Sequence, residues 1–212
     1  MNARIYASDE YKEYAGKIAS RQSVVDVSEI VNVPNGLIIA SGRHSKGVYG
    51  RLGRYVPQSD VTKGKYWHHF MCMPWRGAMS RYMDMDVMYM GSIHWSFGHF
   101  FLEHTNRMWG IGARHVDKYV FVHSKLVKGP VPEFIYKFMA MAGVRREDIL
   151  IVDKNTRFRN VYVPAAASGR YYTSDAWGRT FDAMTDVSLN SRGGLPKIVS
   201  VKMCFAIQNC VW

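Results

Sequence analysis

The chain has 212 residues, with 28 Lys and Arg against 17 Asp and Glu, and a formal net charge of +11. Apolar residues make up 48% and charged residues 21%, a composition that excludes a disordered or fibrous protein. Three Cys without a CxxC pair exclude a disulfide-rich secreted domain, and no apolar run is long enough to predict a membrane-spanning helix. The positive charge favours anionic partners: nucleic acid, lipid surfaces, phosphate-bearing substrates or acidic polysaccharides.

Residues 1–80 are expected to form a small β-rich segment that packs on the domain after it. Residues 24–33 and 37–40 are predicted strands because they are rich in Val and Ile. Pro34-Asn35-Gly36 stands between them, and this tripeptide is a turn signal. The sequence therefore predicts a β-hairpin in this segment.

Residues 81–165 alternate strands and helices, which is typical of an α/β domain with a parallel sheet. The predicted strands are residues 87–90, 118–123, 148–153 and 160–164. The predicted helices are residues 99–109 and 133–142, and Pro132 and Gly143 mark the start and the end of the second one. Residues 166–212 are expected to be a linker and the incomplete start of another domain.

The first of these helices carries the residues with the most chemistry. His99, Glu103 and Arg107 are spaced four apart, so an α-helix places them along one face, and Asn106 borders the same stripe. An imidazole beside a carboxylate can act as a general base with an orienting partner, and an arginine can hold an anion. The same spacing also fits a plain salt bridge between Glu103 and Arg107, with His99 as a structural residue at the helix start.

A metal centre is not expected. His68 and His69 are adjacent, so they point apart on a strand or a helix, and Cys72 adds no evident fourth ligand. A metal hydrolase that uses His99, Glu103 and His104 is a further alternative, but the two imidazoles would diverge by about 140° on a helix.

Several blocks of the chain resemble, in order, motifs of the family 61 glycosyltransferases, which include bacterial capsular-polysaccharide transferases. The first block is Tyr89-Met90-Gly91, Phe97-Gly98-His99-Phe100, Glu103, Arg107 and Trp109, which is similar to a "GHF…E…R.W" helix after a strand. The sequences KYVFVH (118–123), FIYKFMAMAGVRREDILIVD (134–153) and FRNVYVP (158–164) resemble the elements that follow. The resemblance covers residues 24–164.

This resemblance implies a Rossmann-like parallel sheet with flanking helices, similar to the N-terminal domain of a GT-B glycosyltransferase. Such enzymes transfer a sugar with inversion, and a metal is generally not needed. Their N-terminal half handles a glycan or lipid-linked saccharide acceptor, while the other half binds the nucleotide-sugar donor, which is a co-substrate and no cofactor. The resemblance implies that His99 and Glu103 are the catalytic pair, with either one as the base. It implies substrate-binding roles for the residues Arg107, Asn106, His94 and Trp95.

The chain departs from the family after Pro164, where a whole second domain normally follows. Residues 197–204 (KIVSVKMC) resemble only the beginning of such a domain, so we expect a truncated product that lacks a donor site and self-associates through an exposed domain interface. We further expect a cytoplasmic protein in peripheral contact with an anionic membrane and without a nucleic-acid partner. The alternative function is a basic binding module for nucleic acid or an anionic glycan, without catalysis, which the charge and the aromatic content of 14% also fit.

Overall fold

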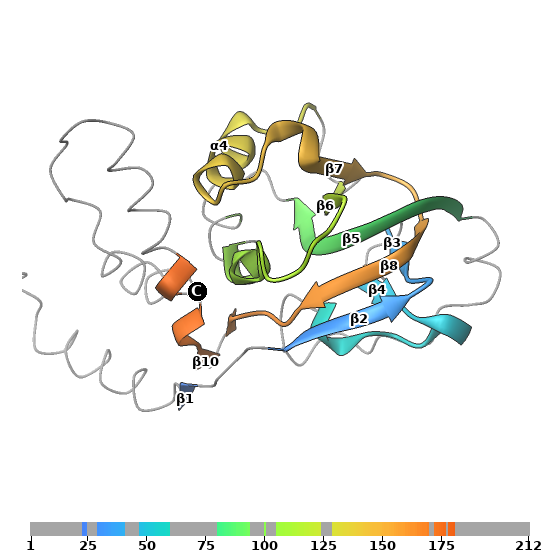
Figure 1. The fold of residues 1–212 in the computed structure, drawn as a ribbon, viewed down its shortest axis with the longest axis horizontal. Coiled ribbons are helices and arrows are strands. Elements are labelled where there is room, and N and C mark those ends of the chain that lie inside the picture. Colours follow the sequence, from blue (N-terminus) through green and yellow to red (C-terminus); the bar gives the residue numbers. More distant parts are fainter. Residues whose placement is uncertain are drawn as a thin grey trace, which may run out of the picture.

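The centre of the fold is a mixed β-sheet of seven strands (Figure 1). The computed structural model describes residues 23–24, 29–40, 47–59, 80–93, 100, 105–123, 129–169, 172–176 and 178–180. The strands of the sheet are β2 (Ile30–Pro34), β3 (Leu37–Ile39), β4 (Gly47–Tyr49), β5 (Arg81–Ile93), β6 (Lys118–His123), β7 (Ile149–Val152) and β8 (Thr156–Pro164). Their order is β4-β3-β8-β5-β6-β7, and β2 also pairs with β8.

Smaller elements surround this sheet. They are the 3-10 helices η1 (Arg51–Gly53), η2 (Pro57–Ser59), η4 (Thr105–Gly110) and η5 (Arg146–Asp148), and the helix α4 (Glu133–Met141). A separate three-stranded sheet joins β1 (Ser23–Val24), β10 (Tyr172–Thr173) and β9 (Ser168–Gly169). No helix in the described part of the chain is long and apolar enough to cross a membrane.

Strand β5 is the spine of the sheet, because it runs parallel to both β8 and β6. Its pairing register shifts between Met83 and Asp86 and again between Tyr89 and Gly91. Bulges of this kind bend a strand and increase its twist. In Figure 1 the arrow of β7 points to the right and that of β8 to the left. Residues 153–155 join β7 to β8, a far shorter connection than a parallel crossover usually needs.

The sheet has an apolar core on each face, and the alternation along β5 separates them. Met88 and Met90 pack with Ile135 and Met139 of α4 on one face. Val87 and Tyr89 point to the opposite face, where they join the valines of β6 and β8. Because both faces are apolar, the central strands read as continuous hydrophobic runs, which is the pattern that predicted them.

The predicted hairpin at Pro34-Asn35-Gly36 is wrong, since β2 and β3 do not pair with each other. Both lie along the same edge of β8, with Ile30 opposite Pro164 and Leu37 opposite Arg157. The register of pairing with β8 is the same before and after the tripeptide, although Asn35 adopts a left-handed φ of 52°.

What changes at this tripeptide is the direction of the side chains. Val33 and Ile38 lie an odd number of residues apart, yet both belong to the same core. In a regular strand they would point to opposite faces. Gly36 is required there for space, because a Cβ would lie 2.7 Å from a methyl group of Val161. The turn signal therefore marks an inversion of the strand's faces, without a reversal of the chain.

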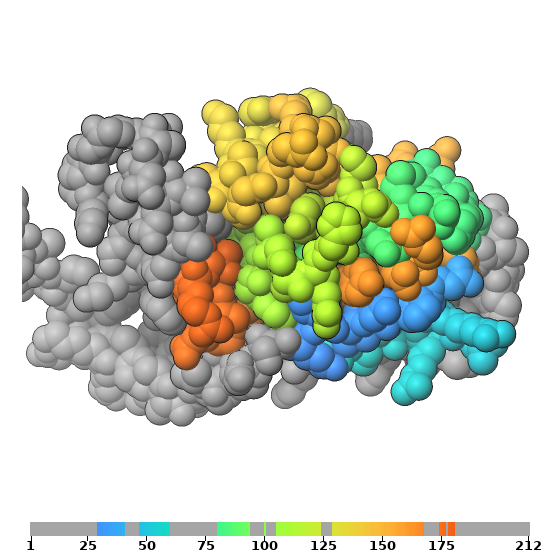
Figure 2. Space-filling view, viewed as in Figure 1, coloured from blue at the N-terminus to red at the C-terminus, as the bar shows by residue number. Residues whose placement is uncertain are grey.

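The expected elements of residues 81–165 agree with the structure in part. Strand β6 has the predicted bounds, and α4 ends one residue earlier than expected. Strands β5 and β8 both begin earlier than predicted, because their first residues are polar or charged and only their later halves are fully apolar. The four strands of residues 81–165 are parallel to one another, as expected. The whole sheet is mixed, because β2, β3 and β4 join it with antiparallel pairings, so the expected boundary at residue 80 cuts through it. These antiparallel strands form the lower right edge of the molecule in Figures 1 and 2.

Candidate functional site

The predicted site residues run along the chain from the end of β5 into η4, and two described parts of this stretch are anchored in the core. Phe100 has no exposed surface and packs edge-on against Phe134 and Phe138 of α4, at centroid distances of 5.2 and 5.7 Å. On the other side, Thr105 and Asn106 are buried at the start of η4. The chain on either side of residues 101–104 is thus held by tertiary packing.

Helix η4 packs tightly over the carboxyl end of β8 (Figure 1). The indole Nε1 of Trp109 donates to the carbonyl of Ala165 at 2.9 Å, and the backbone amide of Ala167 donates to the carbonyl of Asn106 at 2.8 Å. Gly110 meets the ring of Pro164 so closely that a Cβ at residue 110 would lie 2.6 Å from the Pro164 Cγ. No larger residue fits here without a shift of one of the two backbones.

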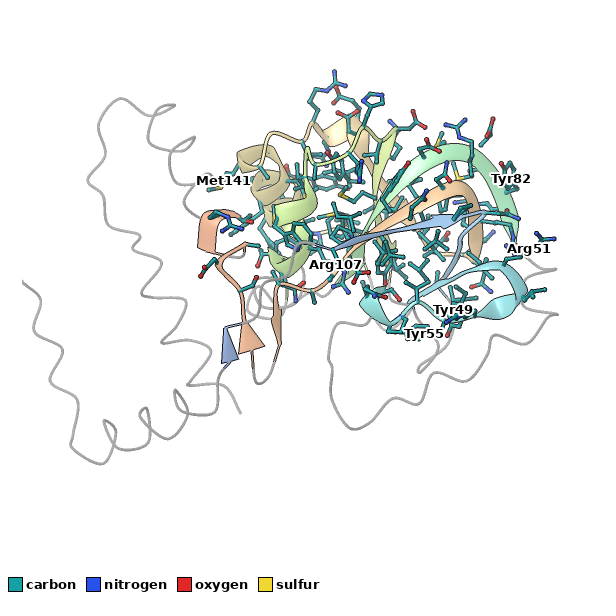
Figure 3. All side chains as sticks on the ribbon, turned by 60° about the horizontal axis from the view of Figure 1, so that its bottom comes forward. Tyr49, Arg51, Tyr55, Tyr82, Arg107 and Met141 are labelled. Carbon is teal, nitrogen blue, oxygen red and sulfur yellow. The ribbon has the colours of Figure 1, made fainter. Side chains whose placement is uncertain are left out.

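Arg107 is the most unusual residue of η4, because its side chain is wholly buried (Figure 3). Its Nη2 donates to the carbonyl of Gln58 in η2 at 2.7 Å, and its Nη1 lies 3.4 Å from the Oδ1 of Asn106. The guanidinium carbon also lies 5.7 Å from the ring centroid of Tyr89. An arginine stays charged at all accessible pH values, so its burial requires such partners.

These contacts tie η4 to η2 and to β5. The next residue of η4, Met108, belongs to the core on the opposite face from Tyr89. Gln58 comes from η2, a segment far from η4 in the sequence. We call the group of Arg107, Asn106, Tyr89 and Gln58 the Arg107 hub.

The structure brings together Asn106 and Arg107 of the six predicted site residues. His94, Trp95, His99 and Glu103 lie outside the described residues, so their roles remain predictions. The helix type is corrected over Thr105–Gly110, which forms a 3-10 helix with three residues per turn instead of an α-helix. The four-residue spacing that placed Arg107 on one stripe with Glu103 therefore does not extend through this segment. Thr and Asn favour such irregular starts because their side chains compete for backbone hydrogen bonds.

The sequence predicts no site role for two members of the hub. Tyr89 stands in a buried strand, where an aromatic residue reads as ordinary core packing. Gln58 contributes only its backbone carbonyl, for which no side-chain signal exists in the sequence. The burial of Arg107 itself was also not foreseen, because arginines are mostly exposed.

A second charged group lies on the surface, at the amino-terminal half of β5 and the adjoining part of β8. Arg159 is within 2.7 Å of Asp86, 3.3 Å of Asp84 and 3.6 Å of Asp117. Hydrogen bonds from Arg159 and from Asn160 lower the pKa of the Asp86 carboxyl below its ordinary value. The guanidinium of Arg159 is therefore occupied by carboxylates. We call these four charged residues the Arg159 cluster.

The Arg107 hub supplies groups suited to binding and positioning. No group of three or more His, Cys, Asp or Glu side chains in these ranges is arranged to hold a metal ion. The hub offers a fixed cation, an amide and an aromatic ring. The predicted base, His99 or Glu103, lies outside the described residues, in the stretch between Ile93 and Thr105.

Comparisons with profiles of protein families, with curated proteins and with solved structures found no match to this chain.

Proposed function

We propose that this chain is the acceptor-side part of an inverting glycosyltransferase that uses a nucleotide sugar. The resemblance to family 61 motifs supports this proposal, since four blocks occur in the same order over residues 89–164. The parallel arrangement of β8, β5, β6 and β7 is compatible with a Rossmann-like acceptor domain of the GT-B type. The nucleotide-sugar donor would be bound by a second domain.

One observation carries the proposal furthest: Phe100 and Thr105, the described residues nearest to His99 and Glu103, are both fixed in the core. His99 is bonded to Phe100, which is anchored under α4, and Glu103 lies two residues before Thr105. Chain geometry keeps the Cα of Glu103 within about 7 Å of that of Thr105. A base and its partner must be held close to the productive geometry, so pinned flanks are what such a site requires.

In the proposed reaction, the base of the His99–Glu103 pair takes the proton from the attacking hydroxyl of the acceptor. The oxygen then bonds to the anomeric carbon as the nucleoside diphosphate leaves from the opposite face, which inverts the configuration. Arg107 has a positioning role, because its buried guanidinium ties η4 to η2 and β5. Asn106, predicted to bind the substrate, is buried beside Arg107 and is given the same positioning role. His94 and Trp95 are proposed to contact the acceptor.

The proposal is tested by acceptor binding, because the donor site is assigned to a second domain. Saturable binding of neutral and acidic bacterial oligosaccharides is measured by calorimetry in about 0.3 M NaCl, which screens charge effects. We expect His99→Ala and Glu103→Gln to weaken the binding at least several-fold, and Lys137→Gln on α4 to leave it unchanged. A chain that binds no oligosaccharide under these conditions contradicts the proposal.

The net charge of +11 favours the second candidate, a basic module that binds nucleic acid or an anionic glycan without catalysis. Electrostatic binding of that kind falls steeply with salt concentration. A gel shift with generic DNA and RNA at two salt concentrations separates the candidates. Tight, salt-sensitive binding of nucleic acid without any oligosaccharide binding would favour the basic module.

A further inference from the structure

The most exposed apolar side chain of the described residues lies at the tip of a short hairpin. After β4 the chain turns back, so that Tyr55 forms a bridge with Tyr49 and the amide of Val56 donates to the carbonyl of Val48 at 2.9 Å. The rings of Tyr49 and Tyr55 lie 5.3 Å apart in the stem. The amide of Gly50 donates to the carbonyl of Arg54 at 2.7 Å and closes the tip, residues 51–54.

Leu52 stands at this tip with 91% of its surface exposed. Its backbone has a φ of 63° and a ψ of 18°, in the left-handed region that residues with a branched or bulky side chain rarely adopt. A solitary exposed leucine needs no explanation. A leucine that is both exposed and held in an unfavourable conformation does, because Gly or Asn would fit the same turn without strain and without exposing apolar surface.

Two cations flank Leu52. Arg51 and Arg54 are both exposed, and no ion pair involves either guanidinium within the described part of the chain. Figure 3 places Arg51 at the outer edge of the molecule, at the same end as Tyr82, the other large exposed hydrophobic residue. In Figure 2 the cyan residues of this segment project beyond the strands next to them.

We propose that residues 51–54 dock on the surface of an anionic phospholipid bilayer. Leu52 would enter the boundary between headgroups and acyl chains, and Arg51 and Arg54 would bind lipid phosphates, a combination typical of peripheral membrane contacts. This inference stands on the geometry of the tip and does not depend on the transferase function.

Lipid fits the tip better than two other occupants. On nucleic acid, an aliphatic side chain at the outermost position would meet phosphates or solvent, whereas aromatic side chains are what stack on bases. A protein partner would need a far larger apolar surface than one leucine to form a specific interface. A bilayer surface accepts a single apolar side chain together with its neighbouring cations.

The test is co-sedimentation of the full chain with vesicles. Vesicles of phosphatidylcholine with about a third phosphatidylglycerol are compared with pure phosphatidylcholine, at low salt and in about 0.3 M NaCl. We expect binding to the anionic vesicles only, weakened by salt. Leu52→Asn should lower the partition coefficient about tenfold, because the apolar contact is lost. Asn accepts the left-handed conformation, so this variant keeps the fold, which circular dichroism verifies.

A matched pair of double variants separates the tip from the overall charge. Arg51→Gln with Arg54→Gln and Lys137→Gln with Arg179→Gln each remove two positive charges, but the second pair lies outside the tip. We expect the first to weaken binding about tenfold or more and the second far less. Equal losses in both, or unchanged binding of Leu52→Asn, would overturn the proposal. A first double variant that loses affinity for nucleic acid but keeps vesicle binding would also overturn it.

Discussion

The Arg107 hub and the Arg159 cluster are two ways of placing an arginine in the same protein. Arg107 has no exposed surface and is held by a carbonyl, an amide and an aromatic ring. Arg159 is about half exposed, with 48% of its side-chain surface accessible, and is bound by three carboxylates. Among the described residues, Arg159 therefore has more charged partners than Arg107, although Arg159 is also the one that water can solvate.

The difference teaches that burial, more than the number of ion pairs, decides how much an arginine matters. Exposed ion pairs contribute little because water already solvates both partners and salt screens them. Burying a guanidinium without hydrogen-bond partners costs folding free energy. Removing a buried guanidinium also costs free energy, because its buried partners are left unpaired. Substitutions in the Arg107 hub should therefore lower the stability of the fold strongly, and substitutions in the Arg159 cluster should lower it little.

The largest effect is expected for Arg107→Ala. This change leaves a cavity and an unpaired carbonyl at Gln58, so we expect the free energy of unfolding to fall by about 3 kcal/mol or more. Arg159→Ala is the matched control and should change the stability far less. Urea denaturation of the three proteins measures both effects. Similar losses for the two variants would break the comparison.

The next effect tests how closely η4 fits against β8. Gly110→Ala places a methyl group 2.6 Å from the Pro164 Cγ, and a proline ring cannot rotate away. We expect a loss of about 2 kcal/mol, the range typical of overpacking. Gly178→Ala is the control, because nothing lies within 4 Å of a Cβ at that glycine. The prediction is contradicted if thermal denaturation shows the two alanines to be equally tolerated.

A smaller effect of opposite sign is expected at the hairpin tip. Leu52→Asn removes the strain of a leucine at positive φ, so we expect the free energy of unfolding to rise by about 1 kcal/mol. Arg54→Asn changes a neighbouring residue with ordinary extended backbone and should give no such gain. A destabilised Leu52→Asn protein in urea denaturation would mean that the leucine makes folded-state contacts, contrary to its exposure.

The smallest effect concerns the pH dependence of the Arg159 cluster. Hydrogen bonds from Arg159 and Asn160 lower the pKa of Asp86 from its ordinary value of 3.8, so the folded state releases this proton more readily than the unfolded state. The resulting stabilisation is fully present above the unfolded pKa and is lost as the pH falls through the folded pKa. Asp86→Asn should therefore cost less than about 1 kcal/mol near neutral pH. The difference from the wild type should shrink below about pH 4.

The control for this prediction is Asp153→Asn, which changes an exposed aspartate outside the cluster. Unfolding free energies are measured from neutral to acidic pH for the three proteins. A difference between the wild type and Asp86→Asn that stays constant down to the acid range would show that the ionised carboxyl does not stabilise the fold.

The sequence predicts the fold best where local pattern and tertiary environment agree. Strand β6 is apolar on both faces and was located to the residue, and α4 is bounded by Pro132 and Gly143. The sequence does not predict the first residues of β5 as a strand, because apolar residues there alternate with aspartates of the Arg159 cluster. The turn signal at Pro34-Asn35-Gly36 does not predict the structure correctly. The backbone irregularity that it marks can exchange the two faces of a strand's side chains, as well as reverse the chain.

The candidate site is less predictable, because its geometry comes from packing between distant segments. Spacing alone predicts Arg107 on one stripe of an α-helix with His99 and Glu103, whereas it lies in a 3-10 helix and is buried against η2. The carbonyl of Gln58 and the close approach of Gly110 to Pro164 arise only when the sheet is assembled. No local rule anticipates such contacts.

The central place of β8 has a consequence for how the chain is made. This strand is the seventh of its sheet to be synthesised, yet it pairs with β2, β3 and β5, and its Pro164 meets Ile30 near the other end of the chain. During translation, β2, β3 and β5 cannot complete their pairing until residue 164 has left the ribosome. Until then, the edges that pair with β8 stay unpaired. Such long-range pairing slows folding and exposes nascent chains to aggregation, so we expect this protein to depend on chaperones that shield strand edges.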